Sequence, residues 1–161
     1  MAIILRESSV TDPELFTVNL EAKPERITDP ALADVLSQLI ALEPIFHHLE
    51  LGIARADFES MTVGDFEEIG ASGRCYSRAE VLDLLEERYA TPRNDVLEEV
   101  LEATDFYCRR LAPDLYLLVY TLLQDKARLT RRSTIWQSTP TGWKIVFHQG
   151  TIVQDTASAV S

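Results

Sequence analysis

The stretch LYLLVYTLL, residues 115–123, is almost entirely apolar, so a strand built from it carries hydrophobic side chains on both faces. A strand that is covered on both sides of its sheet has this composition. Other strand-like segments lie at 100–111 and 129–137, and a fourth covers 143–153. The short link APD joins 100–111 to the stretch 115–123, and DKAR joins that stretch to 129–137. We therefore expect a meander of antiparallel strands with residues 115–123 inside it.

The chain before this meander has a helical pattern. Asp29 followed by Pro30 is a typical helix start, because the missing amide of proline costs nothing in the first turn. Apolar residues then recur at steps of four and three, as they do in a helix that lies on a core. Pro44 interrupts this stripe, since it removes a backbone hydrogen bond and clashes with the preceding turn. We therefore expect a kink, or a stop and restart, near Glu43.

Shorter elements follow this helix. We expect a second helical stretch at 54–61 and a strand in DFEEIGA, residues 65–71. Ser77 and Glu80 form a capping box, in which each side chain satisfies an amide at the start of a helix. The segment TPRND, residues 91–95, is expected to end that helix.

Helices followed by a curved antiparallel sheet define an α+β fold, with the helices packed on one face of the sheet. The length of 161 residues and the hydrophobic content of 46% suit one domain with a sizeable core. We expect this domain at 30–154, after an N-terminal arm at 1–29 and before a flexible tail of small residues at 155–161.

The chain is acidic, with 26 acidic and 15 basic residues and a net charge of -11. Such a field repels phosphate backbones and anionic lipids, so neither nucleic acid nor a membrane is an expected partner. No apolar run approaches the roughly 18 residues of a membrane span, and the first residues form no basic leader, so we expect a cytoplasmic protein. The doublets Arg109-Arg110 and Arg131-Arg132 are either solvated charges or a local anion site. On a strand, the two side chains of a doublet point to opposite faces.

Neither a cofactor nor a metal is expected. Cys75 and Cys108 form no Cys-X-X-Cys motif and have no clustered histidine, so both are interpreted as packing residues. Glu43, His47 and Glu50 are spaced four and three apart, as residues that share a metal or a proton on one side of a helix must be. A single interrupted helix supplies too few ligands for a closed site, and a solvated polar edge is the alternative.

The last hairpin determines which residues share a face of the sheet. Its turn contains TPTG, residues 139–142, which suits a type I turn with a glycine bulge. This turn predicts that Thr139 pairs with Trp143 and that Trp136 pairs with Val146. A slip of one residue would move the side chains of a strand to the other face.

With this register, Trp136 and His148 share one face, and Gln149 lies on the other. Lys144 shares the face of His148 and indicates that this face is the outer one. We therefore expect Gln149 at an internal pocket. Trp136 and His148 are expected on the back of the sheet, near solvent or at a dimer interface.

Several segments together resemble the nuclear transport factor 2-like superfamily over residues 32–153. They are ALE (41–43), RAD (55–57), DFEEIGASGRCYSR (65–78), DFYCRRLAPDLYLLVY (105–120) and RSTIW with GWKIVFHQGT (132–136 and 142–151). The last segment is similar to a bacterial branch of unassigned function whose final strand closes on His-Gln-Gly-Thr. The resemblance implies a cone, in which helices close the concave side of a strongly curved sheet and leave an apolar pocket. It also implies a homodimer formed through the sheet.

The resemblance leaves the activity open. Ketosteroid isomerases, polyketide cyclases and scytalone dehydratase share the cone with non-enzymatic binding and transport modules. The chain has no clear match for the Tyr and two Asp of the isomerases, or for the His and Asp of the dehydratase. No catalytic residue is therefore assigned from the family.

Two main functions remain. In the first, the cone binds a small hydrophobic or partly polar molecule. The expected contacts are the aromatic and amide side chains Tyr107, Tyr120, Trp143 and Gln149. In the second, a cofactor-free isomerase, cyclase or dehydratase uses Glu43 or Glu68 as its general base, and His148 is a further candidate for proton transfer. A structural adaptor with a filled cone is a third alternative.

Overall fold

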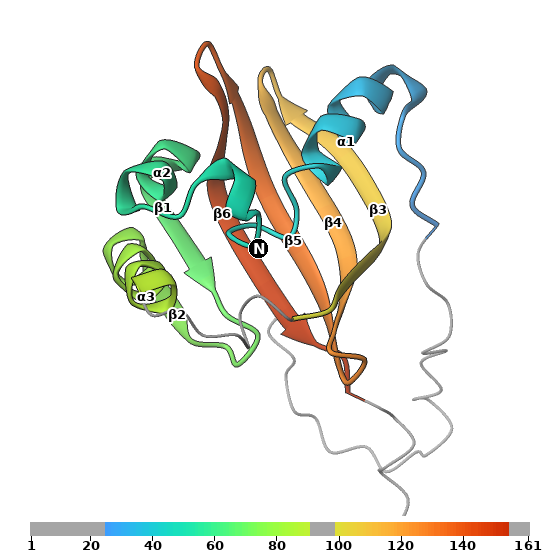
Figure 1. Cartoon of the computed structure of the whole chain (residues 1–161). Helices are drawn as coiled ribbons and strands as arrows, with labels where there is room; N and C mark the ends of the chain where they lie inside the picture. Colours follow the sequence, from blue (N-terminus) through green and yellow to red (C-terminus); the bar gives the residue numbers. More distant parts are fainter. Residues whose placement is uncertain (1–24, 91–98, 155–161) are drawn as a thin grey trace, which may run out of the picture.

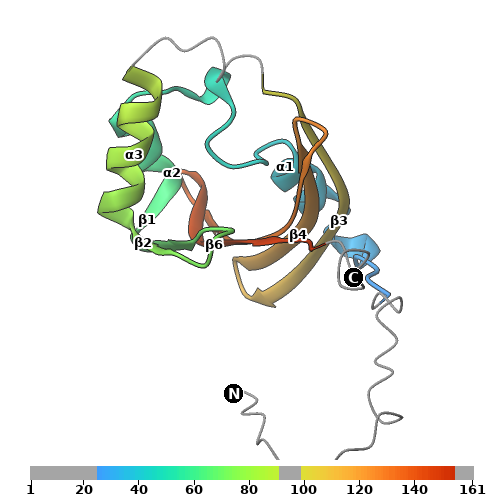
Figure 2. The same cartoon turned by 90° about the horizontal axis from the view of Figure 1, so that it is seen from below.

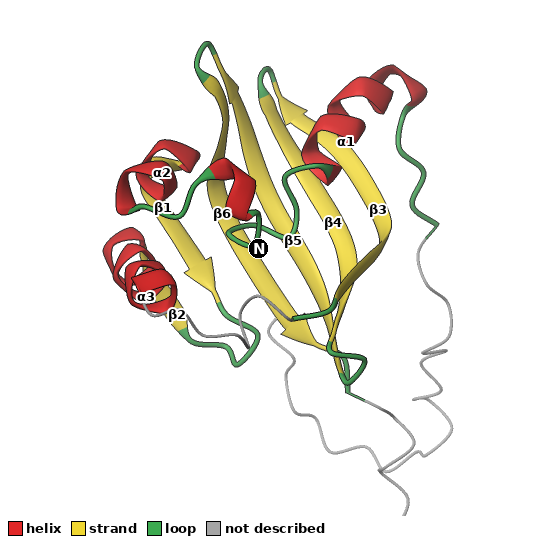
Figure 3. Cartoon of the chain, viewed as in Figure 1, coloured by secondary structure: helices red, strands yellow, loops and turns green. Residues whose placement is uncertain are grey.

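The computed structural model of the chain describes residues 25–90 and 99–154 (Figure 1). The tail predicted at 155–161, most of the arm predicted at 1–29 and the helix end predicted at 91–95 lie outside these residues. The described part has the predicted α+β fold, in which a curved sheet carries helices on its concave side (Figure 3).

In the described residues, four short helices precede the first strand of the sheet, and a longer one follows the second strand. In the described residues they are the 3-10 helices η1 (Pro30–Leu32) and η2 (Leu49–Leu51) and the α-helices α1 (Ala33–Ile40), α2 (Arg55–Met61) and α3 (Arg78–Ala90). The Asp29 carboxylate accepts a hydrogen bond from the Ala31 amide at the predicted start, and the helix ends before Pro44, as predicted. Ser77 and Glu80 exchange hydrogen bonds, which confirms the capping box of α3. None of the helices in these residues is long and apolar enough to span a membrane.

One sheet of six strands runs through the described residues. The strands are β1 (Thr62–Ile69), β2 (Cys75–Ser77), β3 (Leu101–Ala112), β4 (Leu115–Gln124), β5 (Arg128–Thr139) and β6 (Gly142–Ile152), in the order β2-β1-β6-β5-β4-β3. The last four form the predicted antiparallel meander. The sheet as a whole is mixed, because β1 lies parallel to β6. Helix α3 and most of the meander separate these two strands in sequence, and parallel neighbours need such a long crossover.

The sheet is strongly curved but not closed (Figure 2). Helix α1 packs against β3 at one side, whereas α2 and α3 pack against β1 at the other. Register shifts within the β3–β4 pairing and between β1 and β6 add local twist, which helps a sheet to bend. The predicted cone is thus an open, curved sheet whose concave side is covered by helices and by the segment that links α1 to α2.

The interior is filled by the inner face of the sheet and by aromatic residues of the helical half. Its buried hydrophobic residues include Leu39, Phe58, Phe66, Leu118, Tyr120, Leu122, Trp136 and Ile145. On β4 the buried residues alternate with half-buried ones such as Leu117 and Val119. The prediction that both faces of this strand are covered is therefore wrong for the single chain, which buries the inner face only.

The β5–β6 hairpin departs from the predicted register near its turn. Thr139 pairs with Gly142, and Trp136 pairs with Ile145, so the connection is one residue shorter than predicted. Val146 then has no partner on β5, and beyond this bulge the pairing follows the predicted register.

The bulge decides which side chains of β6 face inward. Lys144 lies before the bulge on the outer face, as predicted, but the alternation of faces changes at the extra residue. Trp136 and His148 therefore lie on the inner face and are buried, which contradicts their predicted place on the back of the sheet. Gln149 follows His148 and lies on the outer face, opposite to its predicted position.

Candidate functional site

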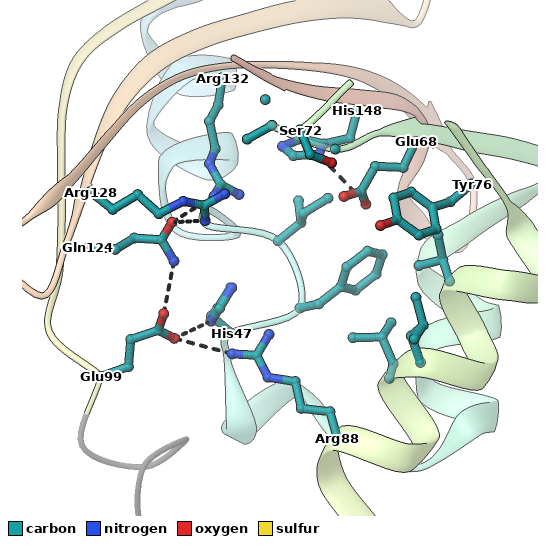
Figure 4. Close-up of a pocket in the computed structure, with 18 residues that line it drawn as sticks. His47, Glu68, Ser72, Tyr76, Arg88, Glu99, Gln124, Arg128, Arg132 and His148 are labelled. Atoms are coloured by element: carbon teal, nitrogen blue, oxygen red, sulfur yellow. Dashed lines mark hydrogen bonds and ion pairs between the residues drawn. The ribbon is translucent and has the colours of Figure 1, made fainter. Parts of the chain in front are cut away.

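A cavity of about 460 Å³ lies between the concave face of the sheet and the segments that cover it. Apolar side chains, among them Ile45, Phe46, Val81 and Leu85, line one part of the wall. Polar side chains from the sheet, from α3 and from the residue Glu99 line the rest (Figure 4). The wall is therefore more polar than the apolar pocket that the resemblance implied.

One row of paired residues crosses the sheet beside the cavity. Tyr76 on β2 pairs with Glu68 on β1, and Glu68 pairs with His148 on β6. His148 in turn pairs with Thr134 on β5. Because directly paired residues point to the same face of a sheet, these side chains are neighbours on the inner face. Tyr76, Glu68 and His148 line the cavity (Figure 4), so the structure brings together two of the three predicted catalytic candidates.

The imidazole of His148 is buried, with 2% of its surface exposed. Among the described residues, neither of its ring nitrogens has a hydrogen-bond partner, and the same is true of Thr134 Oγ1. The Nδ1 atom lies 3.7 Å from Glu68 Oε2, which is an ion-pair distance but too long for a hydrogen bond. Burying an imidazole without partners costs free energy. A molecule in the cavity that hydrogen-bonds to this ring would remove that cost.

Another part of the wall is organised by Glu99. Its Oε1 atom accepts a hydrogen bond from Gln124 Nε2 at 2.8 Å, and its Oε2 atom lies 3.2 Å from Arg88 Nη2 and 3.3 Å from His47 Nδ1. Burial lowers the pKa of His47 from 6.5 to about 3, and the charges of Arg88 and Arg132 act in the same direction. Glu99 alone would favour a charged imidazole, but Arg88 already compensates this carboxylate. His47 is therefore neutral near pH 7.

Two further arginines, Arg128 and Arg132, meet at the same glutamine (Figure 4). Arg128 Nη1 and Arg132 Nη2 donate to Gln124 Oε1 at 3.0 and 3.1 Å, and Arg132 Nε donates to Thr130 Oγ1 at 3.1 Å. Both arginines line the cavity. The ion pairs of the described residues involve other arginines, so within that part of the chain neither guanidinium has a carboxylate partner.

The predicted base Glu43 occupies a different environment. It is buried, with Oε2 accepting hydrogen bonds from the Ile45 amide at 2.9 Å and the Tyr120 hydroxyl at 2.8 Å. Its Oε1 atom accepts one from Trp136 Nε1 at 3.1 Å. Burial and the nearby Glu43 raise the pKa of Tyr120 far above 10, so its hydroxyl remains a donor. The cavity wall includes neither Glu43 nor Tyr120. A ligand in this cavity would therefore not contact Glu43, the predicted base, or Tyr120, a predicted ligand contact.

The other predicted ligand contacts also lie away from the main cavity. Tyr107 pairs with Val119 on the outer face of the sheet, the face that also carries Gln149. Trp143 Nε1 donates to Gln38 Oε1 at 3.0 Å, and its ring lines a separate cavity of about 40 Å³. Bulges in β3 and β6 set the outward faces of Tyr107 and Gln149, whereas Trp143 precedes the bulge of β6 and lines the smaller cavity.

The spacing of Glu43, His47 and Glu50 does not produce a joint site. The helix ends before these residues, and each contacts a different partner: His47 lies beside Glu99, whereas Glu50 Oε1 is 2.9 Å from His48 Nδ1. Within the described ranges, no group of three or more His, Cys, Asp and Glu side chains is arranged to hold a metal ion.

Some residues of the cavity wall were absent from the sequence predictions. Arg88 could have been predicted from its spacing. It follows Val81 by seven residues and Leu85 by three, so it lies on the buried side of α3. Tyr76 had no such signal. It reaches the site through the pairing of β2, β1 and β6, which links segments far apart in the chain.

Comparisons with known proteins identify the fold. No protein-family model matches the chain, and no curated protein matches it. Solved structures do match. An uncharacterised protein with a cystatin-like fold from Caulobacter vibrioides has a TM-score of 0.58 and 18% identity, over 76% of this chain and 92% of that chain.

Two other matches carry the name of the fold. A member of the nuclear transport factor 2-like family from Streptomyces avermitilis, provisionally described as a dehydratase, has a TM-score of 0.58 and 18% identity, over 76% of this chain and 98% of that chain. A nuclear transport factor 2-like protein of unknown function from Pseudomonas aeruginosa has a TM-score of 0.57 and 12% identity, over 73% and 98% of the two chains. This chain therefore has the nuclear transport factor 2-like fold, in agreement with the resemblance in its sequence.

Proposed function

We propose that this domain binds a small, partly polar organic molecule in the cavity of about 460 Å³. His148 carries the proposal. This residue lines the cavity, and the described residues supply neither of its two buried ring nitrogens with a hydrogen-bond partner. Because nearly all buried polar groups in proteins are hydrogen-bonded, the partners are expected to come from the contents of the cavity.

The size and lining of the cavity support a ligand of metabolite size. Binding pockets for small molecules typically measure about 300–1,000 Å³ and combine apolar walls with a few polar groups that fix orientation. Here Phe46 and Leu85 offer contacts for a hydrocarbon part, while His148 and Glu68 offer polar contacts.

A fragment screen on the purified protein tests this proposal. At about ten times the dissociation constant, we expect hits to raise the melting temperature by about 3 °C and to shift the ring resonances of His148 in NMR spectra. His148→Leu should abolish the stabilisation. His48→Gln, which changes a histidine outside this cavity, should preserve it. Hits that leave the His148 resonances unchanged would contradict the proposal.

A second candidate function is proton transfer by a cofactor-free enzyme. The observation in its favour is the Glu68–His148 pair, whose Oε2 and Nδ1 atoms lie 3.7 Å apart at the cavity wall. With Glu68 orienting the ring, His148 could move a proton at a carbon next to a carbonyl, a step that isomerases, cyclases and dehydratases share. The dehydratase description of the Streptomyces protein points to the same reaction class.

Hydrogen exchange in D2O distinguishes an enzyme from a binding module. Carbonyl compounds found in the screen should lose the proton signal of the carbon next to the carbonyl when the enzyme is added. Glu68→Gln should slow this exchange by about 100-fold, within the usual range for removing a general acid or base. Binding without exchange above the rate in buffer would exclude proton transfer for those compounds.

We further propose that two copies of the chain pair through the outer face of the sheet. A half-buried apolar row, Leu117, Ile135 and Phe147, crosses β4, β5 and β6 there in direct register. Light scattering coupled to size exclusion should give twice the chain mass, and Ile135→Lys should give the monomer. Glu87→Lys, on exposed surface of α3, is the control. A dimer that survives Ile135→Lys would contradict this interface.

A further inference from the structure

The cavity also indicates the charge of its ligand. We propose that the ligand is a small organic acid whose carboxylate is held by Arg128 and Arg132, with the rest of the molecule extending toward His148. This inference rests on the proposed binding function and specifies the chemical class of the ligand.

The charges around the cavity are unevenly paired. Among the described wall residues, Arg88 has Glu99 as its ion-pair partner, and Glu68 lies beside His148. Arg128 and Arg132 instead converge on the side-chain oxygen of a neutral residue, Gln124. The chain has a net charge of -11, yet it places two positive groups side by side. Neither has a carboxylate as an ion-pair partner among the described residues.

The described residues hold this arginine pair in place and leave several of its N–H donors without a partner among them. Thr130 is fully buried and Gln124 is 8% exposed, so the two acceptors are fixed parts of the fold. A guanidinium has five N–H donors. The hydrogen bonds of Arg132 within the described residues use Nε and Nη2, and the contact of Arg128 with Gln124 uses Nη1. The remaining donors suit a carboxylate, which arginine binds in a planar, two-pronged geometry.

The neighbouring strand supplies space beside Arg132. Its direct partner on β6 is Gly150, which also lines the cavity and has no side chain to cover the guanidinium. Because His47 has a pKa of about 3 and is uncharged near pH 7, the positive charge of the described wall comes from arginines.

The sheet register also places Arg132 and His148 near each other on the inner face. Arg132 and Thr134 are alternate residues on the inner face of β5, and Thr134 pairs directly with His148. Arg132 and His148 are therefore diagonal neighbours with Cα atoms about 7–8 Å apart. An acid with a carbonyl or hydroxyl group a few bonds from its carboxylate would contact the arginines and the imidazole at the same time.

Matched acid and amide probes test the charge requirement directly. Pairs ranging from propionate and propionamide to 4-hydroxybenzoate and 4-hydroxybenzamide would be titrated by calorimetry and ligand-observed NMR at constant ionic strength. For at least one pair, we expect the acid to bind at least about tenfold more tightly than its amide, because a charge-assisted hydrogen bond is stronger than a neutral one.

Two variants of adjacent arginines supply the control. Arg132→Gln should weaken acid binding by at least about tenfold and remove the preference for the acid. Arg131→Gln should leave both affinities unchanged, since Arg131 is exposed on the opposite face of the same strand. Arg128→Gln provides a second test if Arg132→Gln does not fold, as judged by circular dichroism.

The possible outcomes separate this inference from the proposed function. Amides that bind as tightly as acids, and still shift the His148 resonances, would overturn the acid inference and leave small-molecule binding intact. Binding of neither member of any pair would count against both. Inorganic phosphate that binds as tightly as the best acid would show that the arginines hold a simple anion and would overturn the assignment of an organic acid.

Discussion

Glu43 and His148 are both buried polar side chains, with 4% and 2% of their surfaces exposed, but their surroundings are opposite. The oxygens of Glu43 accept hydrogen bonds from Ile45, Tyr120 and Trp136. Neither ring nitrogen of His148 has a hydrogen-bond partner in the described part of the chain. The first group lies outside the main cavity, and the second lies at its wall.

This difference separates two reasons for burying a polar group. A satisfied carboxylate joins the segment after α1 to strands β4 and β5, and its loss would leave buried donors without an acceptor. A buried imidazole without hydrogen-bond partners lowers the stability of the fold, and departures of this kind are expected at functional sites. Substitutions at the two positions should therefore affect stability and binding in opposite ways.

The largest expected effect is the loss of the Glu43 carboxylate. In Glu43→Leu the Tyr120 hydroxyl, the Trp136 indole and the Ile45 amide all lose their acceptor, so the free energy of unfolding should fall by about 4 kcal/mol. Urea denaturation measures the change. Glu102→Leu, at an exposed position of β3, should change stability by less than about 0.5 kcal/mol. A loss below about 1 kcal/mol in Glu43→Leu would show that the fold does not depend on this network.

His47 is an intermediate case, because it is buried beside one carboxylate and two arginines. Its folded pKa of about 3 lies below the ordinary value of 6.5, since burial and the charges of Arg88, Arg132, His48 and His148 oppose protonation. Between these values the unfolded chain binds a proton that the folded protein does not. The stability is therefore highest above pH 6.5 and falls as the pH is lowered.

Urea denaturation of the wild type and of His47→Gln at pH 7, 6 and 5 tests this linkage. The contribution of His47 corresponds to a loss of about 2 kcal/mol between pH 7 and pH 5, which His47→Gln should remove. Taking the difference between the two proteins cancels the titration of other groups. Equal pH dependence in both proteins would mean that His47 is as easily protonated in the folded state as in the unfolded chain.

The comparison also shows how far the sequence could predict this molecule. The meander was predictable because β3, β4 and β5 are long and joined by short links, and the start of α3 was predictable because Ser77 and Glu80 lie within one turn. The parallel pairing of β1 with β6 was not, because no local pattern brings together strands that lie so far apart in the chain.

The same limit applies to the site. Glu68 and His148 were both named as candidates for proton transfer, and both line the cavity. The face of His148 was predicted wrongly, because the sequence alternates regularly through Val146 and does not indicate the bulge there. The environment of Glu43 depends on Tyr120 and Trp136, which are 77 and 93 residues away. Sequence spacing cannot show that these two donors reach one carboxylate.

A smaller effect is expected when only one donor to Glu43 is removed. Tyr120→Phe keeps the buried ring but removes its hydroxyl, and the carboxylate retains its bonds from Ile45 and Trp136. The free energy of unfolding should fall by about 1.5 kcal/mol, as for a hydrogen bond to a charged group. Tyr107→Phe, on the outer face, serves as the control. An unchanged stability in Tyr120→Phe would indicate that this hydrogen bond forms at no net gain over solvation.

The smallest effect on stability is expected at His148, although the effect on binding should be complete. His148→Leu removes two buried polar atoms that have no hydrogen-bond partner in the described residues and replaces them with apolar volume of similar size. The free energy of unfolding should therefore stay within about 1 kcal/mol of the wild type or rise. The fragments and acids that bind the wild type should no longer stabilise the variant. A loss of more than about 2 kcal/mol, with ligand binding retained, would mean that His148 is structural like Glu43 and that the contrast between the two residues does not mark a binding site.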